Sequence, residues 1–199
     1  MVRTVRLAPG LTGRESGRAA RRVLWTAVAV VIPLVMLIAV MAMSPPAVRR
    51  AVRSPLLGKP APSMVASTID GQAFDLKESK GKWVVVNFFA TWCVPCRQEH
   101  DDLIRFSDSH RAIGDATVVG VVYSDSDQAV REFREAEGGD WPMVSDPKGR
   151  IALNFGVAGV PESFLIDPAG VVVSKILGGV RDIDLDQILA EARDPSLSP

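Results

Sequence analysis

The sequence predicts an α/β domain, with a mixed central sheet and helices on both faces, that follows a single transmembrane helix. Three observations lead to this prediction. Residues 23–43 carry no charge over 21 consecutive positions. Beyond residue 56, apolar runs typical of buried strands alternate with amphipathic runs typical of helices. The last two expected strands are separated only by a short turn, which makes that pair antiparallel and the sheet mixed.

The uncharged run from Val23 to Met43 is long enough to cross a membrane. About 20 apolar residues, at about 1.5 Å each, span a hydrocarbon core of about 30 Å. Pro33 lies in the middle of the run, where a lipid-embedded helix tolerates a proline. A cleaved signal peptide is the alternative, because residues 40–42 (Val-Met-Ala) form a weak cleavage site, but the apolar region of such a peptide is shorter. We therefore expect an uncleaved anchor.

Charge is segregated along the chain, although 23 basic and 23 acidic residues cancel overall. Residues 1–22 hold six arginines and one acidic residue, a net charge of +5 beside the predicted span. Positive residues favour the cytoplasmic side, so we expect residues 1–22 in the cytoplasm. Residues 44–55, rich in proline and arginine, are expected to link the span to an extracytoplasmic domain over residues 56–199. Residues 54–199 hold 14 basic and 22 acidic side chains, a net charge of −8, which argues against nucleic-acid binding.

The first expected strand of the domain is the apolar run over residues 82–89. A continuous run of this kind indicates a strand that is buried on both faces. A helix is expected to follow over residues 95–109, with Leu103, Ile104 and Phe106 on its inner side.

A second strand and helix follow in the same order. Residues 116–123 are again a continuous apolar run, and residues 126–137 have the pattern of an amphipathic helix. Ser126 is a favourable N-cap residue, and Gly138 with Gly139 ends the helical pattern. The two strand-helix pairs predict neighbouring strands with covering helices.

The remaining elements complete the order strand, strand, helix. Residues 162–166 and 171–176 are expected strands, joined by a β-turn over residues 167–170 (Asp-Pro-Ala-Gly). The proline presets φ and the glycine accepts the conformation at the end of the turn. A closing helix is expected over residues 182–193.

The strongest chemical signal is the segment Thr91-Trp92-Cys93-Val94-Pro95-Cys96, where the first strand ends and its helix begins. Two thiols in a C-x-x-C arrangement across a first helical turn close a disulfide with little backbone movement. The N–H groups and positive dipole of the helix N-terminus stabilise a thiolate on the first cysteine. We therefore expect Cys93 to be the exposed catalytic nucleophile and Cys96 to be the catalytic resolving thiol.

Other uses of the two cysteines stay open on these residues alone. They could be a structural pair, although their position between a strand and a helix favours a redox site. Zinc needs four ligands, and the only nitrogen candidates are His100 and His110, so we expect no metal site. A copper-delivery protein of the Sco type would have C-x-x-x-C and a later histidine, and none follows His110. A thiol-based metal- or haem-binding delivery module is thus the alternative outside redox chemistry.

Three segments carry a resemblance to a known family. Residues 84–99 (VVVNFFATWCVPCRQE) resemble the active-site strand and helix of the membrane-anchored thioredoxin-like thiol–disulfide proteins of the TlpA/ResA/DsbE group. Residues 155–167 (FGVAGVPESFLID) are similar to a segment of its DsbE/CcmG branch, and residues 57–62 (LGKPAP) to its domain start. The resemblance covers nearly all of residues 56–199 and implies a thioredoxin-like fold.

The resemblance implies a substrate groove around the disulfide. In this family Pro161 would form a cis peptide bond that faces the disulfide, with the backbone of Val160 free to pair with a substrate strand. Trp92 would shield the thiol of Cys93. The expected groove residues are Trp92, Val94, Pro95, Val160 and Pro161.

The resemblance also points to two glutamates. An acid at the position of Glu162 is associated with the active-site groove, and a carboxylate near Cys96 could relay the proton of that thiol, so Glu162 is the third expected catalytic residue. Glu99 matches the family as well, and a surface charge is the alternative for both glutamates. Asn87 stands where cytosolic thioredoxins carry a buried aspartate, which argues against a general thioredoxin.

The function implied by the resemblance is the reduction of apocytochrome c, which keeps the two cysteines of its C-x-x-C-H motif reduced for haem attachment. A membrane thiol-transfer protein of the DsbD/CcdA kind would then reduce the pair Cys93–Cys96, and no cofactor besides this redox-active disulfide is expected. We expect a monomer. A disulfide-forming oxidase or a general extracytoplasmic reductase is the alternative, since no residue fixes the direction of electron flow.

Overall fold

The computed structural model describes residues 25, 28–29, 31–33, 35–36, 50–51, 54–194 and 196. The chain divides into two compact units, residues 1–46 and residues 47–199. The described positions between residues 25 and 36 are helical, and the rest of the predicted span at residues 23–43 lies outside the described residues, as do residues 1–22 and most of the predicted linker. Among the residues that the structure describes, no helix combines the length and the apolar character that a membrane crossing requires.

The second unit is built on a mixed sheet. Its described strands form a six-stranded sheet in the order β1-β8-β7-β4-β5-β6. These strands are β1 (Arg50–Ala51), β4 (Trp83–Phe89), β5 (Ala116–Val122), β6 (Met143–Val144), β7 (Glu162–Ile166) and β8 (Val172–Leu177). Strands β4, β5 and β6 run parallel, whereas β7 pairs antiparallel with β4 and β8, and β8 with β1. A separate antiparallel pair is formed by β2 (Val65–Ser67) and β3 (Ala73–Asp75).

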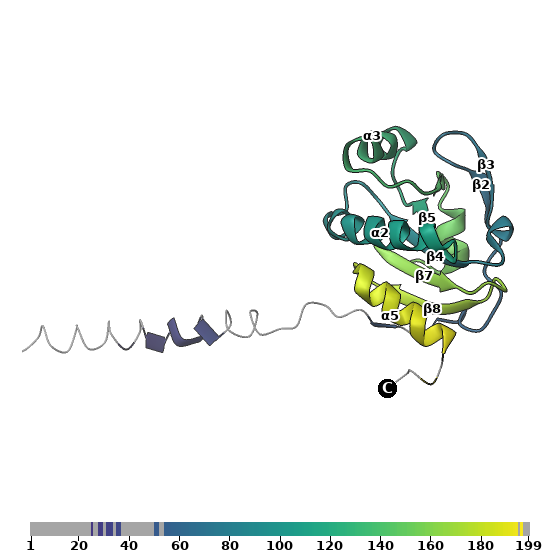
Figure 1. Ribbon diagram of the computed structural model, residues 1–199. Coiled ribbons are helices and arrows are strands. Elements are labelled where there is room, and N and C mark those ends of the chain that lie inside the picture. The colour runs from purple at the N-terminus through teal and green to yellow at the C-terminus, as the bar shows by residue number, and fades with distance from the viewer. Residues whose placement is uncertain are drawn as a thin grey trace, which may run out of the picture. The chain divides into compact units, whose positions relative to one another are not determined.

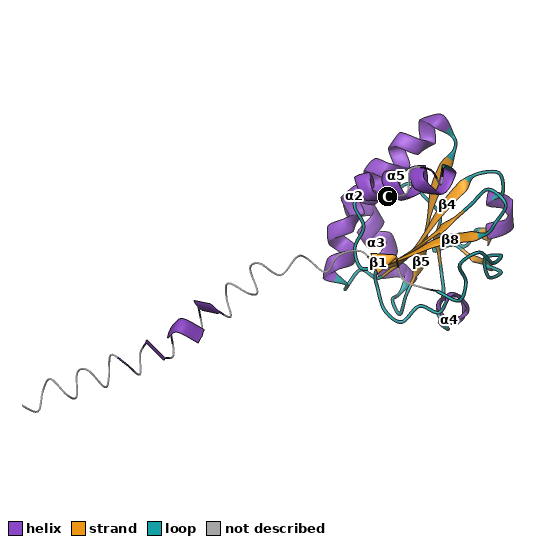
Figure 2. Ribbon diagram, turned by 90° about the horizontal axis from the view of Figure 1, so that it is seen from below, coloured by secondary structure: helices purple, strands orange, loops and turns teal. Residues whose placement is uncertain are grey.

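Helices cover both faces of the sheet (Figures 1 and 2). The helices are α2 (Val94–Ile113), α3 (Asp127–Glu137), α4 (Arg150–Phe155) and α5 (Asp182–Arg193), with a short 3₁₀ helix η1 (Leu76–Ser79). Apolar side chains of α2, α3 and α5 share one core cluster with Val85, Phe89 and Leu165 of the sheet. Side chains of α4 and η1 share a second cluster with Phe88 and Phe164. Adjacent residues of β4 and β7 therefore serve opposite cores, because side chains alternate along a strand.

The predicted α/β architecture is confirmed: the expected strands and helices follow in the expected order, the sheet is mixed, and both faces are covered. The strands β1, β2, β3 and β6 and the helices η1 and α4 are not among the expected elements. The expected bounds of β7 and α5 agree with the structure, and Ser126 caps α3 by accepting a hydrogen bond from the Ala129 N–H at 3.1 Å. Helix α2 is longer than the expected 95–109. It continues to Ile113 and ends at Gly114, whose positive φ of 75° suits a glycine C-cap.

Candidate active site

The two cysteines form a disulfide at the N-terminus of α2, shortly after the end of β4. Cys93 is the N-cap residue of α2, and its sulfur accepts a hydrogen bond from the Cys96 N–H at 3.3 Å. Pro95 lies in the first turn, where its missing N–H costs no helical hydrogen bond. The Cys96 N–H at this helix end therefore points at the Cys93 sulfur, and together with the helix dipole this favours a thiolate there in the reduced form.

The expectation that Cys93 is exposed is wrong for the disulfide form. The exposed fraction is 5% for Cys93 and 4% for Cys96, whereas it is 59% for Trp92 and 64% for Val94. The physical reason is the backbone of the neighbouring loop, since the carbonyl oxygen of Val160 lies 3.6 Å from Cys93 Sγ. A substrate thus first meets the two apolar side chains that flank the nucleophile.

The loop opposite the disulfide has the geometry that the resemblance implied. The peptide bond between Val160 and Pro161 is cis. The Pro161 carbonyl accepts a hydrogen bond from the Gly178 N–H at 3.0 Å, which ties the loop to the end of β8. Within residues 54–194, no backbone hydrogen bond uses the N–H of Val160. The main chain of Val160 is therefore available to an extended substrate segment.

Hydrogen bonds from the loop after β5 hold the segment just before Cys93 in place. One carboxylate oxygen of Asp125 accepts hydrogen bonds from both the N–H and the hydroxyl of Thr91, each at 2.7 Å. The indole N–H of Trp92 donates to the carbonyl of Ser124 at 3.2 Å. The loop after β5 thereby fixes the approach to the nucleophile, and Asp125, 32 positions after Cys93, carries no sequence motif that marks it.

Glu99 lies one helical turn beyond Cys96 on α2 and is buried beside it. Its carboxylate accepts a hydrogen bond from the side-chain amide of Asn87 at 2.8 Å and another from the Val180 N–H at 2.8 Å. Asn87 also donates to the hydroxyl of Ser163 at 3.0 Å. Burial raises the pKa of Glu99 to about 7, although the hydrogen bonds from Asn87 and Val180 oppose the rise. A carboxyl group of this kind exchanges protons near neutral pH.

His100 fills the space behind the resolving cysteine. Its Nε2 lies 3.1 Å from the Gly138 carbonyl, and its ring packs edge-on against Phe133. Burial lowers the pKa of His100, which favours the neutral ring. His100, Cys96 and Asn87 together line a small cavity of about 10 Å³. Among the described residues, no group of three or more His, Cys, Asp or Glu side chains is arranged to hold a metal ion.

Glu162 lies on the other face of the sheet. It precedes Ser163, which faces Asn87 and Glu99, so the side chain of Glu162 points to the α4 side with Phe164. There its carboxylate lies 2.8 Å from Lys175 Nζ and accepts the Ala158 N–H at 3.0 Å. A proton relay from Cys96 to Glu162 stays a prediction, and the positions of the two glutamates favour Glu99 for that role.

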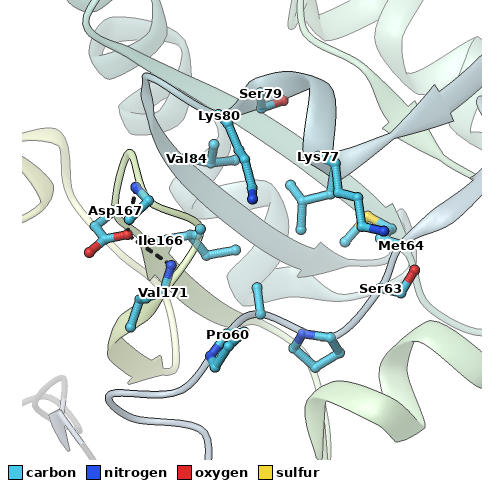
Figure 3. Close-up of a pocket in the computed structure, with 15 residues that line it drawn as sticks. Pro60, Ser63, Met64, Lys77, Ser79, Lys80, Val84, Ile166, Asp167 and Val171 are labelled. Carbon is cyan, nitrogen blue, oxygen red and sulfur yellow. Dashed lines mark hydrogen bonds between the residues drawn. The ribbon is translucent and has the colours of Figure 1, made fainter.

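Another cavity lies away from this chemistry. It has a volume of about 240 Å³ and an apolar floor that includes Met64 and Val84, with Lys77 and Lys80 along its rim (Figure 3). Val84 is near the start of β4, whereas Cys93 follows the end of that strand. The cavity is therefore at the opposite end of β4 from the disulfide.

Comparison with known proteins agrees with this chemistry. The sequence pattern of the AhpC/TSA family matches residues 57–175. The chain is 34% identical over 122 residues to the thiol-disulfide oxidoreductase ResA of Bacillus thuringiensis, which covers 61% of this chain and 70% of that protein. It is 32% identical to the thiol:disulfide interchange protein HelX of Rhodobacter capsulatus over 72% of this chain and 78% of that protein.

A solved structure gives the same result for the fold. The structure of a putative thiol:disulfide interchange protein DsbE from Chlorobium tepidum superposes with a TM-score of 0.62 at 29% identity, and covers 68% of this chain and 96% of that one. Together with the disulfide at the start of α2, these similarities establish what the domain is. The chain belongs to the AhpC/TSA family and is a thioredoxin-like thiol–disulfide oxidoreductase of the ResA/DsbE/HelX type, with Cys93 and Cys96 as its redox pair.

Proposed function

We propose that this oxidoreductase is tethered to the cell membrane and works on the extracytoplasmic side. Residues 23–43 would be the anchor, residues 1–22 its cytoplasmic flank, residues 44–55 the linker, and residues 56–199 the exposed redox domain. The uncharged run of 21 residues and the net charge of +5 before it support this arrangement.

We further propose that the domain reduces the disulfide in the C-x-x-C-H motif of apocytochrome c before haem attachment. The observation that carries the proposal is the disulfide at the N-terminus of α2 beside Val160, whose N–H makes no backbone hydrogen bond within residues 54–194 and can pair with an extended peptide that contains a disulfide. The family resemblance of the segments around Cys93 and Pro161 supports the choice of substrate.

The reaction consists of two exchanges that transfer two electrons to the substrate. In the reduced enzyme, the Cys93 thiolate attacks one sulfur of the substrate disulfide, that bond breaks, and the other substrate sulfur leaves as a thiolate. Cys96 then loses its proton and attacks Cys93 Sγ in the mixed disulfide. The second substrate thiolate leaves, the Cys93–Cys96 disulfide forms, and both substrate thiolates take up protons.

Glu99 would accept the proton of Cys96 in the second exchange. It lies on the same face of α2, is buried, and has a pKa raised to about 7 by that burial. A membrane dithiol protein of the DsbD/CcdA kind would return two electrons through the reverse pair of exchanges. In this scheme the protein needs no other cofactor.

The test uses the full chain in detergent micelles and an oxidised peptide that contains C-x-x-C-H. The reduced enzyme should convert the peptide to its dithiol in a one-to-one reaction, and equilibrium with glutathione should give a reduction potential of about −250 mV. A potential of about −120 mV, with oxidation of the reduced peptide, would instead identify a disulfide-forming oxidase. Stoichiometric haem or metal on the purified reduced protein would identify a delivery module.

A further inference from the structure

A buried ion pair lies beneath the loop that faces the disulfide. Lys175 on β8 and Glu162 on β7 are 9% and 4% exposed, and Lys175 Nζ lies 2.8 Å from a Glu162 carboxylate oxygen. The Lys175 ammonium also lies 5.1 Å from the centre of the Phe164 ring. Two charges removed from water in this way stabilise a fold only when their remaining hydrogen-bonding capacity is satisfied.

Each of the two charges also makes one hydrogen bond to the backbone of residues 156–161, which we name the facing loop. Lys175 Nζ donates to the Gly156 carbonyl at 2.9 Å, at the start of this loop. The second oxygen of Glu162 accepts the Ala158 N–H at 3.0 Å, in its middle. Hydrogen bonds to charged groups are stronger than those between neutral groups, so the pair holds two points of the loop backbone.

The facing loop contains Val160, whose carbonyl oxygen covers the sulfur of the nucleophile Cys93. Two residues beyond Ala158, the carbonyl of Val160 lies 3.6 Å from Cys93 Sγ, and the Val160 side chain packs against the core clusters of both faces. The Glu162 carboxylate itself points to the face opposite Cys96 and Glu99. Any effect of the pair on catalysis therefore passes through the loop backbone.

We propose that Glu162 and Lys175 are positioning residues that hold the facing loop in the conformation to which an extended substrate pairs. This positioning role applies to thiol–disulfide exchange with any extended peptide substrate, whether or not that substrate is apocytochrome c. A peptide or protein disulfide pairs with the backbone of Val160, so loss of the Glu162–Lys175 ion pair weakens its binding. A small disulfide needs only the sulfur of Cys93, and its reaction is unaffected.

The experiment compares two substrates in the full chain in detergent micelles. These are a peptide of about ten residues with one disulfide, and bis(2-hydroxyethyl) disulfide. Lys175→Met should raise the KM for the peptide about tenfold with little change in kcat, and should leave the rate with the small disulfide within about twofold. Glu162→Gln should show a smaller rise in KM, because its amide oxygen still accepts the Ala158 N–H while its charge no longer holds Lys175.

Two controls make the result specific. Arg134 donates two hydrogen bonds of 2.7 Å to Asp70, which join α3 to the turn between β2 and β3. Asp70→Asn disrupts this pairing far from the facing loop, and it should change neither the KM for the peptide nor the rate with the small disulfide. Lys175→Arg keeps the positive charge and the hydrogen-bond donor, so its KM for the peptide should be much closer to that of the wild type than the KM of Lys175→Met.

The proposal fails if folded Lys175→Met or Glu162→Gln keeps the wild-type KM for the peptide. It also fails if both substrates slow equally with a shifted pH–rate profile, because that pattern would make Glu162 the proton relay of Cys96. If Lys175→Met does not fold, Glu162→Gln and Lys175→Arg decide the question. The same two quantities are compared, namely the KM for the peptide and the rate with the small disulfide.

Discussion

The side-chain amide of Asn87 donates a hydrogen bond of 2.8 Å to the carboxylate of Glu99, and both side chains are buried. Asn87 comes from the centre of β4 and Glu99 from the first turns of α2, so the contact joins the strand and the helix that meet at the disulfide. A neutral amide compensates only part of the cost of burying a carboxylate, and burial therefore leaves the pKa of Glu99 near 7.

Replacement of Glu99 by glutamine should change how stability depends on pH. An unfolded glutamate ionises near pH 4.5, whereas Glu99 in the folded chain ionises near pH 7. Between these values the folded state holds a proton that the unfolded state has lost, so stability falls as the pH rises and stays lower above pH 7. The free energy of unfolding of the wild type, relative to Glu99→Gln, should drop by about 3 kcal/mol between pH 4 and pH 8.

Urea unfolding of both proteins in the oxidised state, at steps of half a pH unit, measures this difference. Glu191→Gln on α5, where the carboxylate accepts an exposed hydrogen bond from Gln187, is the matched control and should run parallel to the wild type. A wild-type curve parallel to that of Glu99→Gln over the whole range would show that Glu99 titrates as an ordinary surface glutamate.

Asn87→Asp should create a pair of acids that share one proton. The new carboxylate would lie at hydrogen-bond distance from Glu99, and two such groups cannot both ionise without strong repulsion. We expect the variant to be close to wild-type stability at pH 5 and destabilised by about 2 kcal/mol or more at pH 8. Thermal unfolding at the two pH values tests this, and equal losses at both would exclude the shared proton.

The sequence predicted the redox pair and the order of the elements around it, because both depend on local patterns. The C-x-x-C segment, the apolar runs and the Ser126 cap are each contained within a few residues. The face that Glu162 occupies is not a local property. It depends on the register of β7 against β4, in which Ser163 lies opposite Asn87 and directs its neighbour Glu162 to the other core.

The missed features share this dependence on distant partners. The strands β2 and β6 have three and two residues and make no periodic pattern. Asp125 is a loop aspartate until the fold brings it to Thr91. Lys175 lies in a strand whose sequence suggests an exposed lysine, and only the carboxylate of Glu162 and the carbonyl of Gly156 explain its burial.

The reduced thiols should differ in reactivity. Cys93 receives the hydrogen bond of the Cys96 N–H and caps α2, so its thiolate is stabilised and that of Cys96 is not. Iodoacetamide at pH 6.5 should therefore alkylate Cys93 at least about tenfold faster than Cys96, as read by peptide mass mapping. Cys96→Ser should accumulate mixed disulfides with substrate, since the second exchange is removed. Equal labelling of the two thiols would contradict the asymmetry.

The proposed topology has a direct test in fusions placed after Pro199. A reporter enzyme that needs extracytoplasmic disulfide formation should be active there, and a reporter that works only in the cytoplasm should be inactive. Replacement of Arg18, Arg21 and Arg22 by asparagine should reduce this preference, because three arginines would then remain before the span, equal in number to Arg49, Arg50 and Arg53 after it. Alkaline extraction of membranes should leave the chain in the pellet. A soluble form beginning near Met43 would mean a cleaved signal peptide, and a reporter active only in the cytoplasm would reverse the orientation.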